Sequence, residues 1–443
     1  MKKKLGFLFV FFSVLLILTA CGGKEKNSTD ATAKKADANG RVTLDFWSFW
    51  GSGARKDVIE AIIADFNQSQ DKITVKYTYQ PWGDIWTKSL SAITAGNPPD
   101  VIVQDINSVA QRAQAKQATA LDKYIDKDTS KQFYPQLWET TLYEDKSYAL
   151  PFNTDTQVIF YNKKLLKEVG VTEDNLPQTW EELEKVAHKL DQKKGNDYSR
   201  IGFYPLWNIG ADVWALNADN GVSWFDRDGQ VKIDTPNKVT ALEWIEKWQK
   251  FYGRDTINRL EAEFGSGVSD PFISGTVAMR AQNINYYSSL MENAPDDFDF
   301  GVMQLPEKTK GSGHWSWGGG FVLEIPYGAK HAKESYEFMK YLTSEKVQEK
   351  FGEKSFDIMA NKTANENLVK NKNLSEKGQM VYKMADDNFP NTVITPVPLT
   401  APDYNSLVNE QLDQALMGSK SPEAALQAAQ KAVTDLVKQN KTK

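Results

Sequence analysis

Between residues 41 and 104, apolar side chains recur first with the period of a strand and then with the period of a helix, twice over. This pattern predicts three strands separated by two amphipathic helices, at 41–49, 54–69, 73–79, 84–95 and 101–104. Consecutive strands that are joined through helices run parallel and pack those helices on the faces of their sheet. The segment therefore predicts a layered α/β fold.

The composition places the chain among ordinary globular proteins and excludes several functions. Of its 443 residues, 41% are hydrophobic and 25% are charged. This length exceeds what one typical hydrophobic core supports, so it predicts two lobes. A net charge of -5 argues against a nucleic-acid partner, which requires a basic surface. His188, His314 and His331 lie far apart, and no HExxH, GxSxG or GxxxxGK[ST] motif occurs. We therefore expect no metal and no cofactor.

The N-terminus has the pattern of an exported protein. Lys2, Lys3 and Lys4 precede an apolar run at 5–18 that is too short to span a bilayer comfortably. A basic start, a short apolar core and small residues after it predict a signal peptide at residues 1–20. Removal of its three lysines would change the net charge from -5 to -8.

Cys21 is the only cysteine, and it directly follows that signal peptide. Leu-Thr-Ala-Cys at 18–21 resembles the lipobox of bacterial lipoproteins, which implies cleavage before Cys21 and acylation of the new terminus. Two or more acyl chains anchor a protein stably to a membrane. Residues 22–40 contain no large apolar side chain, so we expect 21–40 to be a lipidated cysteine and a disordered spacer. A free cysteine in an ordinary secreted protein is the alternative.

Six segments downstream carry a resemblance to a known family. They are NPPDVIV (97–103), YALPFNTDTQVIFYNKKLL (148–166), PQTWEEL (177–183), FISGTVAM (272–279), GGGFVLEIPYGAKHAKESYEFMKYLTS (318–344) and SPEAALQAAQKAV (421–433). In this order they resemble the family 1 extracellular solute-binding proteins of ATP-driven importers, which are similar to maltose-binding protein. The resemblance implies a periplasmic-binding-protein-like α/β fold with two lobes, about three hinge crossings and a ligand cleft between the lobes. It places lobe one at 41–152 plus 318–360, and lobe two at 153–317 plus 361–443.

The resemblance also implies a function. A lipid-anchored, monomeric, non-enzymatic receptor would close its hinge on an oligosaccharide and deliver it to permease subunits served by a cytoplasmic ATPase. Thirteen tryptophans favour an oligosaccharide over a monosaccharide, and an α-glucan type is the first hypothesis. The lipobox and the low cysteine count fit the surface of a Gram-positive cell, and an inner-membrane lipoprotein remains an alternative.

Two other functions remain alternatives. An exported glycoside hydrolase would also have tryptophan-lined subsites, and it needs two carboxylates at a defined separation, which Asp105 and Asp155 could supply. A sensing or adhesion module with the same fold would bind sugar without transport. Breakdown of an oligosaccharide would distinguish a hydrolase from a transport receptor. Genetic linkage to permease genes would distinguish a transport receptor from a sensing or adhesion module.

A neutral sugar offers C–H faces on which aromatic rings stack and hydroxyls that planar polar groups bond. We therefore expect ligand contacts from aromatic and polar residues at predicted strand ends, loops and crossings. They are Trp47, Trp50, Gln80, Trp82, Asp105, Asn153, Asp155, Trp207, Trp214, Asn285, Tyr286, Trp315, Trp317, Gly319, Asp357 and Tyr404. For the tryptophans the competing interpretation is core packing, and for Asp105 it is a helix cap.

Three of these positions carry a specific expectation. Chain reversal at residues 51–53 would leave Trp50 at the cleft rim. Asp155 lies at a crossing, where it would meet ligand or fix the hinge. Trp315 and Trp317 precede three glycines, which predicts an aromatic platform on a mobile crossing.

Overall fold

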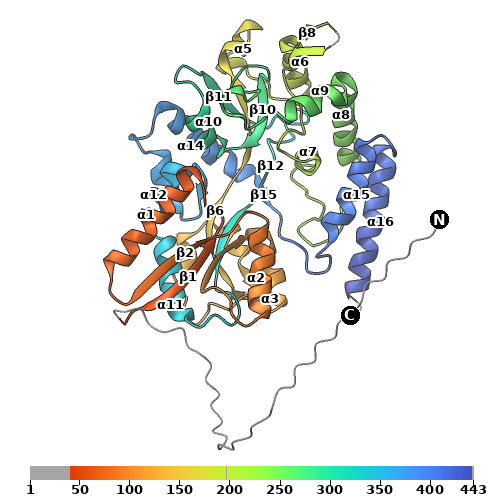
Figure 1. Ribbon diagram of the computed structural model, residues 1–443. Helices are drawn as coiled ribbons and strands as arrows, with labels where there is room; N and C mark the ends of the chain where they lie inside the picture. The colour runs from red at the N-terminus through yellow and green to blue at the C-terminus, as the bar shows by residue number, and fades with distance from the viewer. Residues whose placement is uncertain (1–39, 196, 442–443) are drawn as a thin grey trace, which may run out of the picture. The chain divides into compact units, whose positions relative to one another are not determined.

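A computed structural model describes residues 40–195 and 197–441 (Figure 1). The predicted signal peptide, Cys21 and almost all of the predicted spacer lie outside the described residues. In the described part of the chain, no helix combines the length and the apolarity needed to cross a membrane.

A six-stranded sheet contains the three strands predicted between residues 41 and 104. Its strands, in spatial order, are β14 (Ile358–Met359), β6 (Ala149–Thr154), β13 (Gly320–Glu324), β3 (Val101–Asp105), β1 (Val42–Ser48) and β2 (Ile73–Tyr79). The strand β1 pairs in parallel with both β2 and β3, whereas β13 runs antiparallel between β3 and β6. The predicted parallel strands are therefore confirmed.

Helices cover both faces of this sheet. On one face, α1 (Gly53–Ser69) buries Val58, Ile59, Ile62, Ile63 and Phe66. These side chains join a hydrophobic cluster with α11 (Ala332–Leu342) and α12 (Glu345–Ser355). On the other face lie α2 (Asp84–Thr94), the short helix η1 (Ile106–Ser108) and α3 (Val109–Gln114).

A second, antiparallel sheet has β7 (Gln157–Asn162) at its centre, between β10 (Met279–Asn283) and β11 (Phe300–Gln304). Two short links connect it and its surroundings to the six-stranded sheet. The first runs from β6 to β7 through Asp155 and Thr156, and the second runs from β12 (Ser316–Gly318) to β13 through Gly319. A longer passage of the chain runs from β14 to β15 (Thr392–Ile394), which pairs with β12.

A second hydrophobic cluster packs beside β7 and β10, and its helices carry clear sequence signals. The helix α6 (Trp180–Leu190) begins with a capping box formed by Thr179 and Glu182, as their spacing predicts. The other principal helices of this cluster are α7 (Ala211–Ala218), α8 (Pro236–Tyr252), α9 (Arg254–Glu261), α15 (Tyr404–Leu416) and α16 (Pro422–Lys441).

Further helices and strands complete the structure around these clusters. The helices are α4 (Pro135–Glu139), α5 (Lys163–Glu168), α10 (Tyr286–Asn293), α13 (Lys362–Val369) and α14 (Glu376–Asn388). The strands are β4 (Leu142–Tyr143), β5 (Lys146–Ser147), β8 (Gln192–Lys194), β9 (Asp197–Arg200) and β15 (Thr392–Ile394). Side chains of α13 and α14 join the first cluster, while α15 and α16 join the second. The lobe boundaries given above stay a prediction.

Candidate ligand-binding site

A cavity of about 240 Å³ lies where the two hydrophobic clusters meet. One wall comes from the end of β3 and from η1, and the other comes from α7, α8, β12, the start of α15 and the chain before it. The lining residues are Asp105, Asn107, Asp212, Leu216, Ser223, Trp224, Lys238, Trp317, Thr395, Val397, Tyr404 and Asn405. Three predicted site residues, Asp105, Trp317 and Tyr404, are thus brought together in one cavity.

Asp105 is both the last residue of β3 and the cap of η1. Its Oδ1 accepts a hydrogen bond of 2.9 Å from the backbone N–H of Asn107. Burial raises the pKa of the Asp105 carboxyl, although the nearby Arg112 guanidinium opposes that shift. The side-chain Oδ1 of Asn107 is buried without a hydrogen-bond partner among the described residues. Asn107 thus brings an unsatisfied acceptor to the cavity wall.

Three aromatic residues, Trp224, Trp317 and Tyr404, contribute to the opposite wall. The indole N–H of Trp317 donates to Thr395 Oγ1 at 2.9 Å, which fixes the ring plane. The Tyr404 ring packs edge-on against Phe225 at 5.1 Å, and burial raises the Tyr404 pKa to about 12. These rings offer flat apolar faces of the kind that stack on a sugar.

The charged side chains of the cavity differ in whether they are free to bind a ligand. Lys238 Nζ is already satisfied by Asp219 Oδ2 at 2.8 Å and by the carbonyl oxygens of Ser223 and Lys232 at 2.8 and 2.5 Å. Burial lowers the Lys238 pKa, although the Asp219 carboxylate opposes that shift. Asp212 lines the same cavity from α7, and burial raises the pKa of its carboxyl. The lining thus accepts hydrogen bonds more readily than it attracts anions.

Asp155 lies beside the cavity, at the link between β6 and β7. Its Oδ1 accepts from the backbone N–H of Gly319 at 2.8 Å, and its Oδ2 accepts from Asn283 Nδ2 at 3.0 Å. Burial raises the Asp155 pKa to about 6, and the charge of Asp357 adds to the shift. Asp155 and Gly319 therefore tie the two inter-sheet links together.

Asp357 and Asn285 form a second polar cluster away from the cavity. Asp357 Oδ1 accepts from Arg55 Nη2 at 2.7 Å and from Asn285 Nδ2 at 3.0 Å, and its side chain is buried. Asn153 is also buried, on β6 where that strand pairs with β13 and β14. Asn153, Asn285 and Asp357 do not line the cavity.

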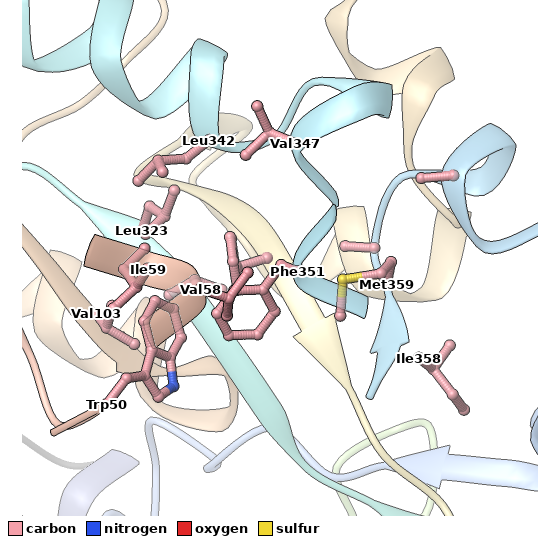
Figure 2. Packing of buried hydrophobic residues seen from close by; sticks show 14 of the residues in the cluster. Trp50, Val58, Ile59, Val103, Leu323, Leu342, Val347, Phe351, Ile358 and Met359 are labelled. Carbon is pink, nitrogen blue, oxygen red and sulfur yellow. The ribbon is translucent and has the colours of Figure 1, made fainter. Parts of the chain in front are cut away.

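Four predicted site residues lie in the hydrophobic cores. Trp50 is only 2% exposed and contacts the rings of Phe152 and Phe351, so it lies in the first cluster and not at a rim (Figure 2). Trp207 and Trp214 are buried in the second cluster, and Tyr286 packs on Phe160 in the first. The expectation that Trp50 reaches the rim is wrong, because strand alternation continues through Ser48 and turns Trp50 toward the core.

The other four predicted residues lie nearer the surface. Trp82 is 62% exposed and contacts Phe49, Trp86 and Phe321, none of which the sequence analysis selected. The remaining three are half-buried or exposed and bond locally: Trp47 to Asp45, Gln80 to Lys88, and Trp315 to Ser312. All sixteen ligand contacts themselves stay predictions.

Most of the cavity lining was not predicted from the sequence, including Asn107, Asp212, Trp224, Lys238, Thr395 and Asn405. A signal was available for Asp212, which is the one charged residue of α7. A carboxylate in a helix of mostly apolar residues is costly to bury without a role. The other residues come from segments that meet only after folding.

A neighbouring hollow of about 440 Å³ lies between α2 and α3 and shares Asp105 with the cavity. At its base, the Arg112 guanidinium binds the carboxylate of Glu324 with a shortest separation of 2.5 Å, and Glu324 is 2% exposed. The Arg112 Nη2 group also donates to the backbone oxygen of Asp105 at 2.9 Å. This buried ion pair therefore supports the strand end that carries Asp105.

Comparison with known proteins assigns the fold and the family. The family described as bacterial extracellular solute-binding protein matches residues 50–349. A multiple sugar-binding protein of Streptococcus mutans is 24% identical over 84% of each chain. An sn-glycerol-3-phosphate-binding periplasmic protein of Brucella melitensis is 23% identical over 87% of this chain and 91% of its own.

Among solved structures, CpMnBP1 with mannotriose bound has a TM-score of 0.76 and 25% identity, over 88% of this chain and 99% of its own. This likeness confirms the predicted two-lobe α/β fold. Because the family match spans more than half of the sequence, the chain belongs to the bacterial extracellular solute-binding proteins.

Proposed function

We propose that this protein is the lipid-anchored receptor of an ABC importer and that it binds a neutral oligosaccharide, with an α-glucan as the first candidate. The observation that carries the proposal is the cavity that combines the rings of Trp224, Trp317 and Tyr404 with the acceptors of Asp105 and Asn107. Stacking faces opposite hydrogen-bond acceptors are complementary to a sugar. The receptor would act as a monomer and pass its ligand to membrane permease subunits.

The charge of the cavity favours a neutral sugar over a phosphate ester, although one relative is named for sn-glycerol 3-phosphate. Its one lysine is saturated by three acceptors, and the two carboxylates of Asp105 and Asp212 would repel a phosphate. The relative named for multiple sugars and the solved structure with mannotriose bound support the same choice.

The geometry gives little support to a glycoside hydrolase. Both carboxylate oxygens of Asp155 accept hydrogen bonds from protein donors, Gly319 and Asn283. One oxygen of Asp105 is used to cap η1. A catalytic carboxylate must keep an oxygen free for the glycosidic oxygen, the anomeric carbon or a water.

A thermal-shift panel tests the proposed ligand class. We expect maltotriose or mannotriose, among neutral oligosaccharides, to raise the melting temperature by mass action and sn-glycerol 3-phosphate to leave it unchanged. The Trp317→Ala variant should weaken binding about tenfold or more, because it removes a stacking face. Trp315→Ala is the matched control, since that ring does not line the cavity.

Two results would count against this assignment. If sn-glycerol 3-phosphate alone raises the melting temperature, the ligand is an anion and the charge argument fails. If the bound oligosaccharide is cleaved on prolonged incubation, as thin-layer chromatography would detect, the protein is an enzyme.

The lipid anchor is tested at Cys21, which is the only thiol in the chain. We expect the full-length Cys21→Ser variant, expressed in a bacterium, to leave the membrane fraction, because the acyl chains have no attachment point. The wild-type chain should remain with the membrane and gain the mass of its acyl groups. Retention of the serine variant on washed membranes would contradict the anchor.

A further inference from the structure

A proline-containing segment closes one side of the ligand cavity. We define the strap as residues 395–402, which connect β15 to α15 and contain Pro396, Pro398 and Pro402. Proline fixes its own φ and restricts the preceding residue to extended conformations, so Thr395 and Val397 are held stiffly. Both residues line the cavity.

One backbone hydrogen bond connects the strap to the opposite wall. The N–H of Val397 donates to the carbonyl oxygen of Asn107 at 2.7 Å. Asn107 follows β3 of the six-stranded sheet, whereas Val397 packs against the second hydrophobic cluster. The bond therefore joins the two walls at a position distant in sequence from both inter-sheet links.

The strap is also coupled to residues that would contact ligand. Thr395 Oγ1 accepts from the Trp317 indole, and Asp105 holds Asn107 through the cap of η1. A ligand that occupies the cavity would thus touch the same residues that position both ends of the Val397–Asn107 bond. Because Val397 lies between two prolines, its N–H is pre-organised and little entropy is lost when the bond forms.

We propose that the strap is a gate on the ligand cavity and that the bond from Val397 N–H to the Asn107 carbonyl sets the rate of ligand release. This inference rests on the proposed function, because it requires a ligand in the cavity. Release must break this bond between the walls, and Val397 thereby acts as a positioning residue without needing to bond the ligand itself.

A single substitution removes the hydrogen-bond donor while keeping an apolar side chain. Val397→Pro lacks the N–H, and the strap already accommodates prolines on either side. Val397→Ala is the matched control, since it loses the side-chain contacts and keeps the N–H. We expect maltotriose, or mannotriose if that binds instead, to dissociate about two- to tenfold faster from the proline variant than from the alanine variant, as stopped-flow tryptophan fluorescence would show.

Equal dissociation rates for the two variants would overturn the gate, provided that both have wild-type circular dichroism. If the wild-type chain binds neither sugar, the proposed function fails, and a ligand-independent measurement decides the inference. In a Cys21→Ser background, Asn107→Cys with Val397→Cys should form a disulfide on mild oxidation, whereas Asn107→Cys with Leu399→Cys should form it far more slowly. If the disulfide between positions 107 and 397 does not form faster than the one between 107 and 399, the strap does not contact Asn107 through Val397.

Discussion

Replacing Trp50 with alanine is expected to lower the free energy of unfolding by about 3–5 kcal/mol, the cost typical of removing a large aromatic side chain from a core. The ring is 2% exposed and contacts Phe152 and Phe351 at centroid separations of 4.9 Å each. Figure 2 shows it with Val58 and Phe351 among the residues of the first cluster. Such tight surroundings cannot collapse fully into the space that the indole leaves. Chemical denaturation monitored by circular dichroism measures the loss.

Trp82 provides a matched control for this prediction. Its ring is 62% exposed and packs on neighbouring rings only along one side, so Trp82→Ala should cost about 1 kcal/mol or less. Both tryptophans were candidates for ligand contact. The free energies of unfolding of the two alanine variants show which of them lies in a core. A Trp50→Ala protein as stable as the Trp82→Ala protein would contradict the packing described here.

Replacing Arg112 with methionine is expected to destabilise the fold by about 3–5 kcal/mol, because it leaves the Glu324 carboxylate buried without its cation. Glu324 is 2% exposed, and its nearest separation from the Arg112 guanidinium is 2.5 Å. The substitution also removes the donor to the Asp105 carbonyl oxygen. Equilibrium unfolding in urea, at more than one pH, measures the effect.

The pH dependence of this loss has a defined sign. Burial already raises the pKa of Glu324 above its ordinary value of 4.5, and loss of the arginine raises it further. An acid with a raised pKa in the folded state loses stability as the pH rises from its ordinary value through its folded value. The deficit of Arg112→Met should therefore be smaller at pH 5 than at pH 8.

A double variant separates the charge from the packing. Arg112→Met combined with Glu324→Gln carries no buried charge, so it should regain a large part of the lost stability at pH 8. If the double variant is no more stable than Arg112→Met, then the stranded carboxylate is not the cause. A deficit that is equal at pH 5 and pH 8 would lead to the same conclusion.

The repeating pattern of residues 41–104 predicted β1, β2 and β3 as parallel strands joined through helices, because periodicity reports which side chains face a core. The same rule, applied for two more residues, would have placed Trp50 correctly. Alternate residues lie on one face of the sheet, and those on the buried face here are Leu44, Phe46, Ser48 and Trp50. Phe49 has the opposite parity and joins the exposed aromatic group of Trp82.

The cavity was harder to predict, because its walls come from segments far apart in the chain. Asp105 could be recognised because it is the charged residue that ends an otherwise largely apolar strand. Val397 and Asn107 are 290 residues apart, and the bond between them uses backbone atoms that every residue possesses. Side-chain chemistry therefore gave no sign of it, and Trp224 and Asn405 likewise gain their meaning only from their neighbours in space.

Gly319, before β13, and Gly320, its first residue, bring the two inter-sheet links close together. Gly320 adopts φ of +137°, and a Cβ atom there would lie 2.3 Å from the backbone oxygen of Asn153. This close approach, with the 2.6 Å bond from Thr154 Oγ1 to the Gly319 carbonyl oxygen, fastens the two inter-sheet links side by side. Paired in this way, they form a single two-stranded ribbon. We therefore expect these two short links to bend together rather than separately when one sheet moves against the other.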